Sequence, residues 1–163
     1  MFYNICVKFA ALGTITVLGM VPDAPHASTL EERRDKGAEV VLKLNNGVAQ
    51  QNLEGMRQEF PFLAEATEAY ALGDVWSRPG LDDRTRQLAA VAAFASIGLT
   101  ELMTVHAGYA LNVGVSEDEL KEIVYMITVP AGFPRAIAAS QALSALFAER
   151  ANKGGNRPAG ATP

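Results

Sequence analysis

The chain has 163 residues, of which 49% are hydrophobic and 20% are charged, a composition that suits one globular domain with tails. Its formal net charge of -4 argues against the basic surface that nucleic-acid binding needs, so we expect no nucleic-acid partner. Cys6 is the only cysteine, and His26 and His106 are the only histidines. These counts exclude a Cys-x-x-Cys redox pair and a zinc site built from His and Cys, which leaves carboxylate-only magnesium binding as the one open metal chemistry.

The N-terminal segment reads as a secretory signal. Lys8 precedes an uncharged run over residues 9–21, and a stretch of Pro, Ala and His follows. The run is too short to span a bilayer comfortably. We therefore predict a signal peptide over residues 1–27, with a periplasmic or secreted mature chain.

Two alternatives to this cleaved signal stay open. A cut after Ala27 would place Pro25 at the third position back, where a small residue is preferred. Residues 1–21 could instead be a retained membrane anchor. A start at Met20 would make the protein cytoplasmic.

The rest of the chain has helical periodicity and no alternating strand of useful length, which predicts an all-α domain over residues 28–150. Thr29 with Glu32 predicts a capping box for a peripheral helix that stops at Asn46-Gly47. After a polar stretch, a second helix is expected from Pro61 to about Gly73. The apolar residues of these two helices that we expect to be available for burial are Val40, Val41, Leu44, Leu63, Tyr70 and Leu72.

Three more helices are expected toward the C-terminus of the domain. Asp82 caps an Ala-rich helix that ends at Gly98 and should be central. A helix from Thr100 to Gly114 and a helix capped by Ser116 and Glu119 should form a central hairpin.

A final helix completes the predicted domain. Pro130 and Gly132 should break the pattern, and Pro134 should restart a helix that runs to about Arg150. Residues 151–163 are expected to be a disordered tail.

Several segments together resemble the carboxymuconolactone decarboxylase family. They are GDVWSRPGLDDRTRQLAAVAA, HAGYALNVGVSEDELKEI and AGFPRAIAA, and with ERRDKGAEV they cover residues 32 to 147. The resemblance implies a compact helical subunit of the alkylhydroperoxidase-like fold that forms a homotrimer or homohexamer. It also implies a lyase that works without a cofactor and removes carbon dioxide from a lactone acid in aromatic catabolism. Relatives with a Cys-x-x-Cys pair are peroxidases, but Leu99 and Leu102 occupy those positions here.

His106 is the candidate catalytic residue. An imidazole can exchange a proton near neutral pH, and a decarboxylation needs a proton at the carbon that loses carbon dioxide, so His106 is predicted to be the general acid. The alternative is a buried structural histidine bonded to a carbonyl or a Tyr hydroxyl.

The remaining candidates would bind a small anionic or lactone substrate. Trp76, Arg78 and Arg86 are predicted to do so, and Arg84 and Arg135 are further cations nearby in sequence. In the alternative interpretation, Trp76 fills the core and Arg78 pairs with Asp74.

Three positions depart from the family pattern. Leu102 stands where the decarboxylases carry Glu, Met126 where they carry Gln or His, and Pro130 where they carry Tyr. Glu101 cannot replace the missing carboxylate, because five residues place it about 140° around the helix from His106. These departures support the competing hypothesis of a non-catalytic oligomeric binding or scaffold protein. Export would also separate the protein from aromatic catabolism inside the cell.

Overall fold

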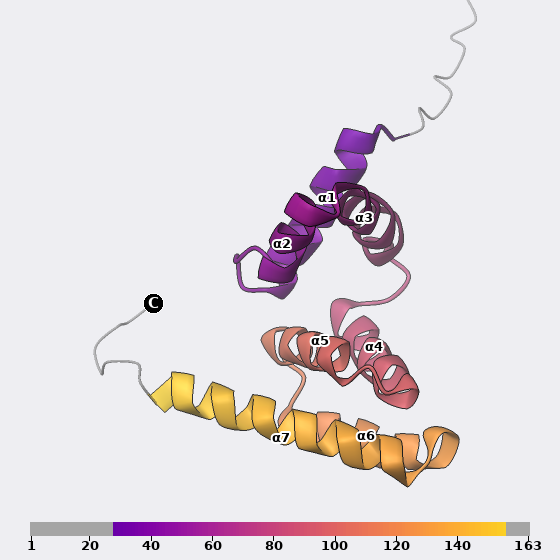
Figure 1. Cartoon of the computed structure of the whole chain (residues 1–163), viewed down its shortest axis with the longest axis vertical. Coiled ribbons are helices and arrows are strands. Elements are labelled where there is room, and N and C mark those ends of the chain that lie inside the picture. Colours follow the sequence, from indigo (N-terminus) through magenta and orange to yellow (C-terminus); the bar gives the residue numbers. More distant parts are fainter. Residues whose placement is uncertain (1–27, 156–163) are drawn as a thin grey trace, which may run out of the picture.

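In the computed structural model, which describes residues 28–155, these residues fold into helices in two groups (Figure 1). The N-terminal group contains α1 (Leu30–Leu44), α2 (Gln51–Glu59), α3 (Pro61–Ala66) and the π-helix η1 (Thr67–Trp76). The C-terminal group contains α4 (Asp83–Ile97), α5 (Thr100–Asn112), α6 (Glu117–Ala131) and α7 (Phe133–Gly155). The all-α prediction is confirmed. The predicted signal peptide lies outside the described residues, and none of the described helices is long and apolar enough to cross a membrane.

The helix starts lie where the predicted caps place them. Thr29 and Ser116 each form a full capping box with the Glu three residues later, and the Asp82 side chain accepts a hydrogen bond from the Thr85 amide. Gly98 ends α4 at φ 81°, a left-handed conformation that glycine adopts without strain. These ends depend on contacts within four residues, so the sequence alone reveals them.

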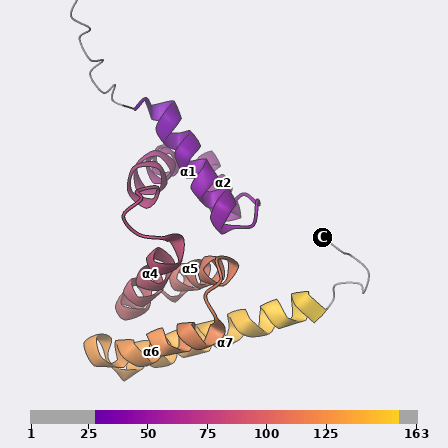
Figure 2. The same ribbon diagram turned by 180° about the vertical axis from the view of Figure 1, so that it is seen from behind.

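The C-terminal group is built around α4, which contacts α5, α6 and α7. A central helix hairpin is present, but it pairs α4 with α5, and α6 packs on α4 and α7 instead of on α5. Figure 2 shows α6 and α7 running side by side beneath α4 and α5. Its apolar core includes Val91, Met103, Leu120, Ile127 and Leu143.

The N-terminal group depends on a close crossing of α1 and η1. Gly37 of α1 lies against the Glu68 backbone, and Gly73 of η1 lies against the Arg33 backbone, so that a Cβ atom at either glycine would overlap a carbonyl oxygen. The Arg33 guanidinium donates to both carboxylate oxygens of Asp74, at 2.9 and 2.5 Å. Gly73 was predicted to end a helix, but η1 continues through it to Trp76. The missing side chain of Gly73 instead allows η1 to approach α1 closely.

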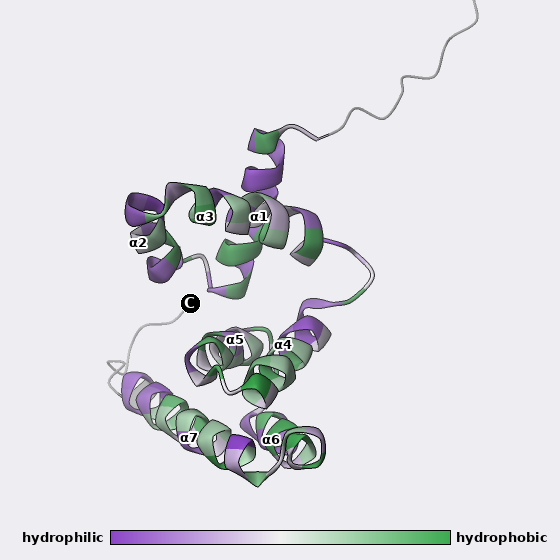
Figure 3. Ribbon diagram, turned by 45° about the vertical axis from the view of Figure 1, so that its right-hand side comes forward, coloured by the Kyte–Doolittle hydropathy of each residue, from purple (hydrophilic) through white to green (hydrophobic). Residues whose placement is uncertain are grey.

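Two predictions of the N-terminal group are wrong. The polar stretch around Gly55 forms α2, which Gln50 caps through the Asn52 amide and which buries Leu53. Leu63 and Tyr70, expected to be available for burial, are exposed. In Figure 3 the α1 and α2 ribbons include strongly hydrophilic stretches, whereas α4 and α5 are mostly hydrophobic.

Two predictions of the C-terminal group also change. Pro130 lies inside the last turn of α6, where it removes one intrahelical N–H donor without ending the helix, which continues to Ala131 and is capped by Gly132. Helix α7 continues five residues beyond the expected end at Arg150, to Gly155. Residues 156–163 of the predicted tail lie outside the described part of the chain.

Candidate functional site

His106 lies on α5 and meets Gln87 of α4 across the central hairpin. The Nδ1 atom of His106 is 2.8 Å from the Oε1 atom of Gln87. Gln87 is completely buried, at 0% exposure. The hydrogen-bond partner of His106 is therefore the carbonyl oxygen of a buried side-chain amide, a partner that also fits the alternative of a structural histidine.

Three aromatic rings surround the imidazole. The Phe94 ring stacks on it with centroids 5.1 Å apart, and the Trp76 ring is tilted by 31° at 5.3 Å. Tyr109 meets it edge-on at 6.0 Å. Trp76 comes from the end of η1, so the π-helix brings the N-terminal group into contact with α5 at this point. The ring contacts and the Gln87 bond together fix the plane of the imidazole.

Burial decides the protonation state of His106. Removal from water lowers the pKa of the imidazole from 6.5 to about 4, because the charged form loses its hydration. Burial also raises the pKa of the Tyr109 hydroxyl, an effect that a hydrogen bond with Gln50 opposes. At neutral pH the free subunit therefore holds an uncharged imidazole beside an uncharged phenol.

Two N–H groups next to the imidazole have no hydrogen-bond partner in the described part of the chain. They are Nε1 of Trp76 and Nε2 of Gln87, and both are buried. A buried donor without a partner costs about 1–3 kcal/mol, so native folds keep few of them. Both belong to residues that contact His106, so this cluster places polar groups inside an otherwise apolar core.

Arg78 shares a cavity with Trp76. The cavity has a volume of about 570 Å³, and its lining residues are Lys36, Glu39, Val40, Lys43, Trp76, Ser77, Arg78, Pro79, Leu81, Asp82 and Asp83. Lys43 pairs with Asp83 across it. Arg86 does not line it, and its guanidinium donates to the Arg78 carbonyl. The structure therefore brings Trp76 to both His106 and this cavity, and gives Arg86 a role in holding the loop.

The other candidate cations are used elsewhere. Arg84 pairs with Glu119, and the Arg135 guanidinium lies against Gly98 at the end of α4. Asp74 pairs with Arg33, so the suggested pair between Arg78 and Asp74 does not form. Arg78 is the one predicted cation that lines a cavity together with a ring neighbour of His106.

The three positions that depart from the family pattern lie on the surface of the subunit. Leu102 is 46% exposed, Met126 is 52% exposed, and Pro130 is exposed as well. None of them is hydrogen-bonded to the imidazole or is one of its aromatic neighbours. Leu102 nevertheless lies one turn before His106 on α5, on the same face of the helix.

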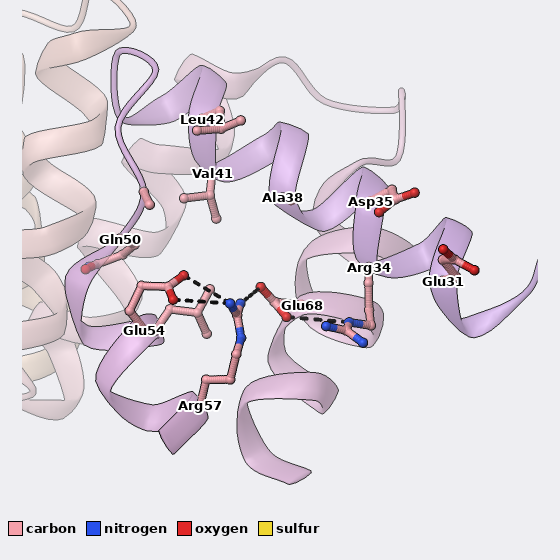
Figure 4. Close-up of a pocket in the computed structure, with 12 residues that line it drawn as sticks. Glu31, Arg34, Asp35, Ala38, Val41, Leu42, Gln50, Glu54, Arg57 and Glu68 are labelled. Carbon is pink, nitrogen blue, oxygen red and sulfur yellow. Dashed lines mark hydrogen bonds and ion pairs between the residues drawn. The ribbon is translucent and has the colours of Figure 1, made fainter. Parts of the chain in front are cut away.

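A separate cavity of about 440 Å³ lies between α1 and α2, and Figure 4 shows its residues. The buried Glu68 carboxylate faces the Arg57 and Arg34 guanidinium groups there, and Arg57 also pairs with Glu54. The opposite charges compensate one another, which is what a buried carboxylate requires. This cavity shares no residue with the His106 cluster, and we interpret its charges as a structural network of the N-terminal group.

Gln87 is the site residue that sequence reasoning missed. It lies in the same row as the buried Val91 and Ala95, where an apolar residue would be expected. A polar side chain at the buried end of an otherwise apolar row is the signal that could have identified it. Within residues 28–155, no group of three or more His, Cys, Asp or Glu side chains is placed to hold a metal ion.

Comparison with known proteins identifies the family. The model of the Carboxymuconolactone decarboxylase family matches residues 61–145, which include Trp76, Gln87 and His106. The chain belongs to this family. It is 35% identical to 4-carboxymuconolactone decarboxylase of Acinetobacter baylyi over 98 residues, which cover 60% of this chain and 70% of that protein.

A second relative is also a decarboxylase, but its name gives a different acid as its substrate. The chain is 33% identical to nitrosuccinic acid decarboxylase of Metarhizium robertsii over 87 residues, 52% of this chain and 61% of that protein. The two relatives share decarboxylation and differ in the acid that their names give. The family therefore supports a decarboxylase-like function for this chain.

Proposed function

We propose that the protein is a cofactor-free decarboxylase of a small acid, with His106 as the residue that transfers the proton. The observation that carries the proposal is a half-buried imidazole, bonded at Nδ1 and flanked by three rings, in a chain whose relatives are decarboxylases. The relatives' names describe acids that also carry a lactone or a nitro group. Such groups withdraw electrons, so the substrate class we propose is an acid with an electron-withdrawing group near its carboxylate. A carboxymuconolactone is its leading member.

The proposed reaction breaks the carbon–carbon bond to the substrate carboxylate. Its electron pair passes into the electron-withdrawing group while carbon dioxide leaves. Nε2 of His106, which takes a proton from water when the substrate binds, then delivers that proton to the carbon, and the imidazole returns to its neutral form. One residue and solvent supply everything that the balance of this step needs.

The low pKa of His106 adds a condition to its proposed role as general acid. An imidazole with a pKa of about 4 is neutral at neutral pH in the free subunit, so it lacks the acidic proton that a general acid needs at Nε2. A substrate anion bound beside Nε2 stabilises the imidazolium and raises that pKa. We therefore propose that substrate binding itself charges the acid, with Arg78 and Trp76 as the cation and ring that receive the substrate from their shared cavity.

Assembly into a homotrimer or homohexamer is part of the proposal. Large apolar side chains are exposed at the start of α5, at the end of α6 and at the start of α7, with Val129 at 89% exposure. They are Leu99, Leu102, Met126, Val129, Phe133 and Ile137. Exposed apolar side chains in this number support contact with further copies of the chain. Native mass analysis that finds only monomers at micromolar concentration would contradict it.

Export also remains a proposal. N-terminal sequencing of the native protein should begin near Ser28 if the segment over residues 1–27 is a cleaved signal. An intact Met1, or a start at Met20 in a cytoplasmic pool, would contradict export.

The decisive experiment measures carbon dioxide release from carboxymuconolactone and from nitrosuccinate. His106→Asn should reduce release from the active substrate by about 100-fold or more, because general acid catalysis contributes 10²–10⁴-fold. Gln141→Asn, at an exposed position of α7, is the control and should leave the rate unchanged. A folded wild-type protein that releases carbon dioxide from neither acid would favour the non-catalytic scaffold.

A further inference from the structure

Gln87 occupies a place where the fold alone would favour an apolar side chain. On α4 it forms one buried row with Val91 and Ala95, and this row faces the core of the C-terminal group. A buried amide is stable only where hydrogen bonds replace its lost hydration. Gln87 satisfies its Oε1 atom with His106 and leaves its Nε2 atom without a partner in the described residues. The amide therefore gains a hydrogen bond with the imidazole, and the cost in stability is a buried N–H group without a partner.

We propose that Gln87 is a positioning residue that holds His106 as the neutral tautomer with its proton on Nδ1, so that Nε2 is the atom that exchanges protons with a substrate. The amide oxygen can only accept a hydrogen bond, so the 2.8 Å contact requires the Nδ1 atom to donate. The lone pair of the neutral ring then lies on Nε2. This inference deepens the proposed function. The role of Nε2 in the reaction rests on that function, whereas the tautomer itself is a property of the protein without substrate.

The opposite orientation of the amide makes the opposite prediction. If the Gln87 nitrogen faced Nδ1, the amide would donate and the imidazole proton would have to sit on Nε2. That tautomer presents no lone pair to an incoming acid. The orientation of the Gln87 amide therefore determines the tautomer of the His106 imidazole, and a measurement of the tautomer gives the orientation as well.

The amide also keeps charge away from the ring. The aromatic and hydrogen-bonding neighbours of the imidazole are Trp76 of η1, Gln87 and Phe94 of α4, and Tyr109 of α5, and of these four only Tyr109 titrates. A carboxylate in place of the amide would stabilise the imidazolium, whereas a neutral amide does not oppose the effect of burial. Gln87 thus orients the ring and leaves its charge to be set by the substrate.

Nitrogen-15 NMR of the full chain labelled at histidine tests the proposal without any substrate. Only two imidazoles contribute signals, and the spectrum of His106→Asn assigns them. The His106 signals should be those of the neutral tautomer with the proton on Nδ1 at pH 7. Signals of the tautomer with the proton on Nε2 would overturn the proposal.

Two substitutions at position 87 sharpen the test. Gln87→Met fills a similar volume without a hydrogen bond, so the two tautomers should mix, and kcat should fall about tenfold or more with little change in KM. Gln87→Glu should raise the pKa of His106 by about one to three units and move the pH profile of turnover upward. Gln141→Glu makes the same change at an exposed position of α7 and should do neither.

The outcomes separate this proposal from the proposed function. A folded Gln87→Met variant with an unchanged tautomer and an unchanged pH profile would overturn the positioning role, even if Gln87→Glu fails to fold. The expected tautomer in a wild-type protein that decarboxylates neither acid would leave the positioning role standing and contradict the decarboxylase.

Discussion

The α4–α7 group has one apolar core that runs through all four of its helices, whereas the apolar cluster of the α1–η1 group is small and has Val41, Leu53 and Ala64 as its buried members. The N-terminal group compensates with two glycines at the α1–η1 crossing and with ion pairs, among them Arg33 with Asp74. Partly exposed ion pairs contribute little, typically less than about 1 kcal/mol. Apolar burial therefore makes the C-terminal group the more stable part of the molecule. The N-terminal group depends instead on the close backbone contact between α1 and η1.

The candidate site lies where the two groups meet. His106, Gln87, Phe94 and Tyr109 belong to the C-terminal group, and Trp76 closes the cluster from the N-terminal group. Close by, the Asn112 side chain of α5 donates to the Leu44 carbonyl of α1 at 2.9 Å. The group with the larger apolar core thus holds His106, the proposed proton-transfer residue, and the less stable group contributes Trp76 to its surroundings.

The largest expected effect is the loss of a core side chain from the C-terminal group. Leu120→Ala removes a fully buried side chain, which typically costs about 2–5 kcal/mol. Because the N-terminal core is too small to persist alone, circular dichroism and the fluorescence of Trp76, the only tryptophan, should report one shared unfolding transition in urea. The exposed Leu42→Ala should change stability by about 0.5 kcal/mol or less. Two separate transitions in Leu120→Ala would contradict this order of stability.

A smaller effect, confined to the N-terminal group, is expected at the helix crossing. Gly37→Ala forces α1 away from η1 and should cost that group about 3 kcal/mol. Hydrogen exchange should accelerate in α1 and η1 and stay unchanged in α4 and α6. Gly55→Ala, where the added methyl group meets nothing, should instead stabilise α2 by about 0.5–1 kcal/mol. Equal loss of protection in both groups would show that they unfold as one unit.

The smallest of the three effects concerns acid stability at the junction. The pKa of His106 is about 4 in the folded chain against a usual value of 6.5, so between these pH values the unfolded chain binds a proton that the folded chain does not. The stability contributed by the neutral imidazole is therefore complete above pH 6.5 and is lost as the pH falls toward 4. Between pH 7 and pH 5 the loss should be about 2 kcal/mol.

Urea unfolding of the wild type and of His106→Asn at pH 7 and pH 5 measures this loss. Other groups titrate in both proteins, so the quantity of interest is the extra destabilisation of the wild type. Equal destabilisation of the two proteins would mean that the imidazole is well hydrated and that the groups do not enclose it.

Much of the helix layout could be predicted from the sequence. The capping boxes at Thr29 and Ser116, the Asp82 cap and the stop at Gly98 were all predicted, because each depends on atoms within a few residues. Membership in the carboxymuconolactone decarboxylase family, seen first as a resemblance of segments, is confirmed by the comparisons. His106 was likewise identified as the candidate centre, and the assignment of its role remains a prediction.

Only the tertiary structure decided which side chains surround that centre. Gln87 is nineteen residues from His106 and reaches it because α4 pairs with α5, a pairing that periodicity did not predict. Gly73, which was predicted to end a helix, lies inside η1, which continues to Trp76. There it packs closely against the backbone of α1. Local rules fix where helices begin, because caps are short-range. Which helix faces meet depends on how well the side-chain volumes of all the helices fit together in the core. That fit involves residues far apart in the sequence, so local sequence patterns do not reveal it.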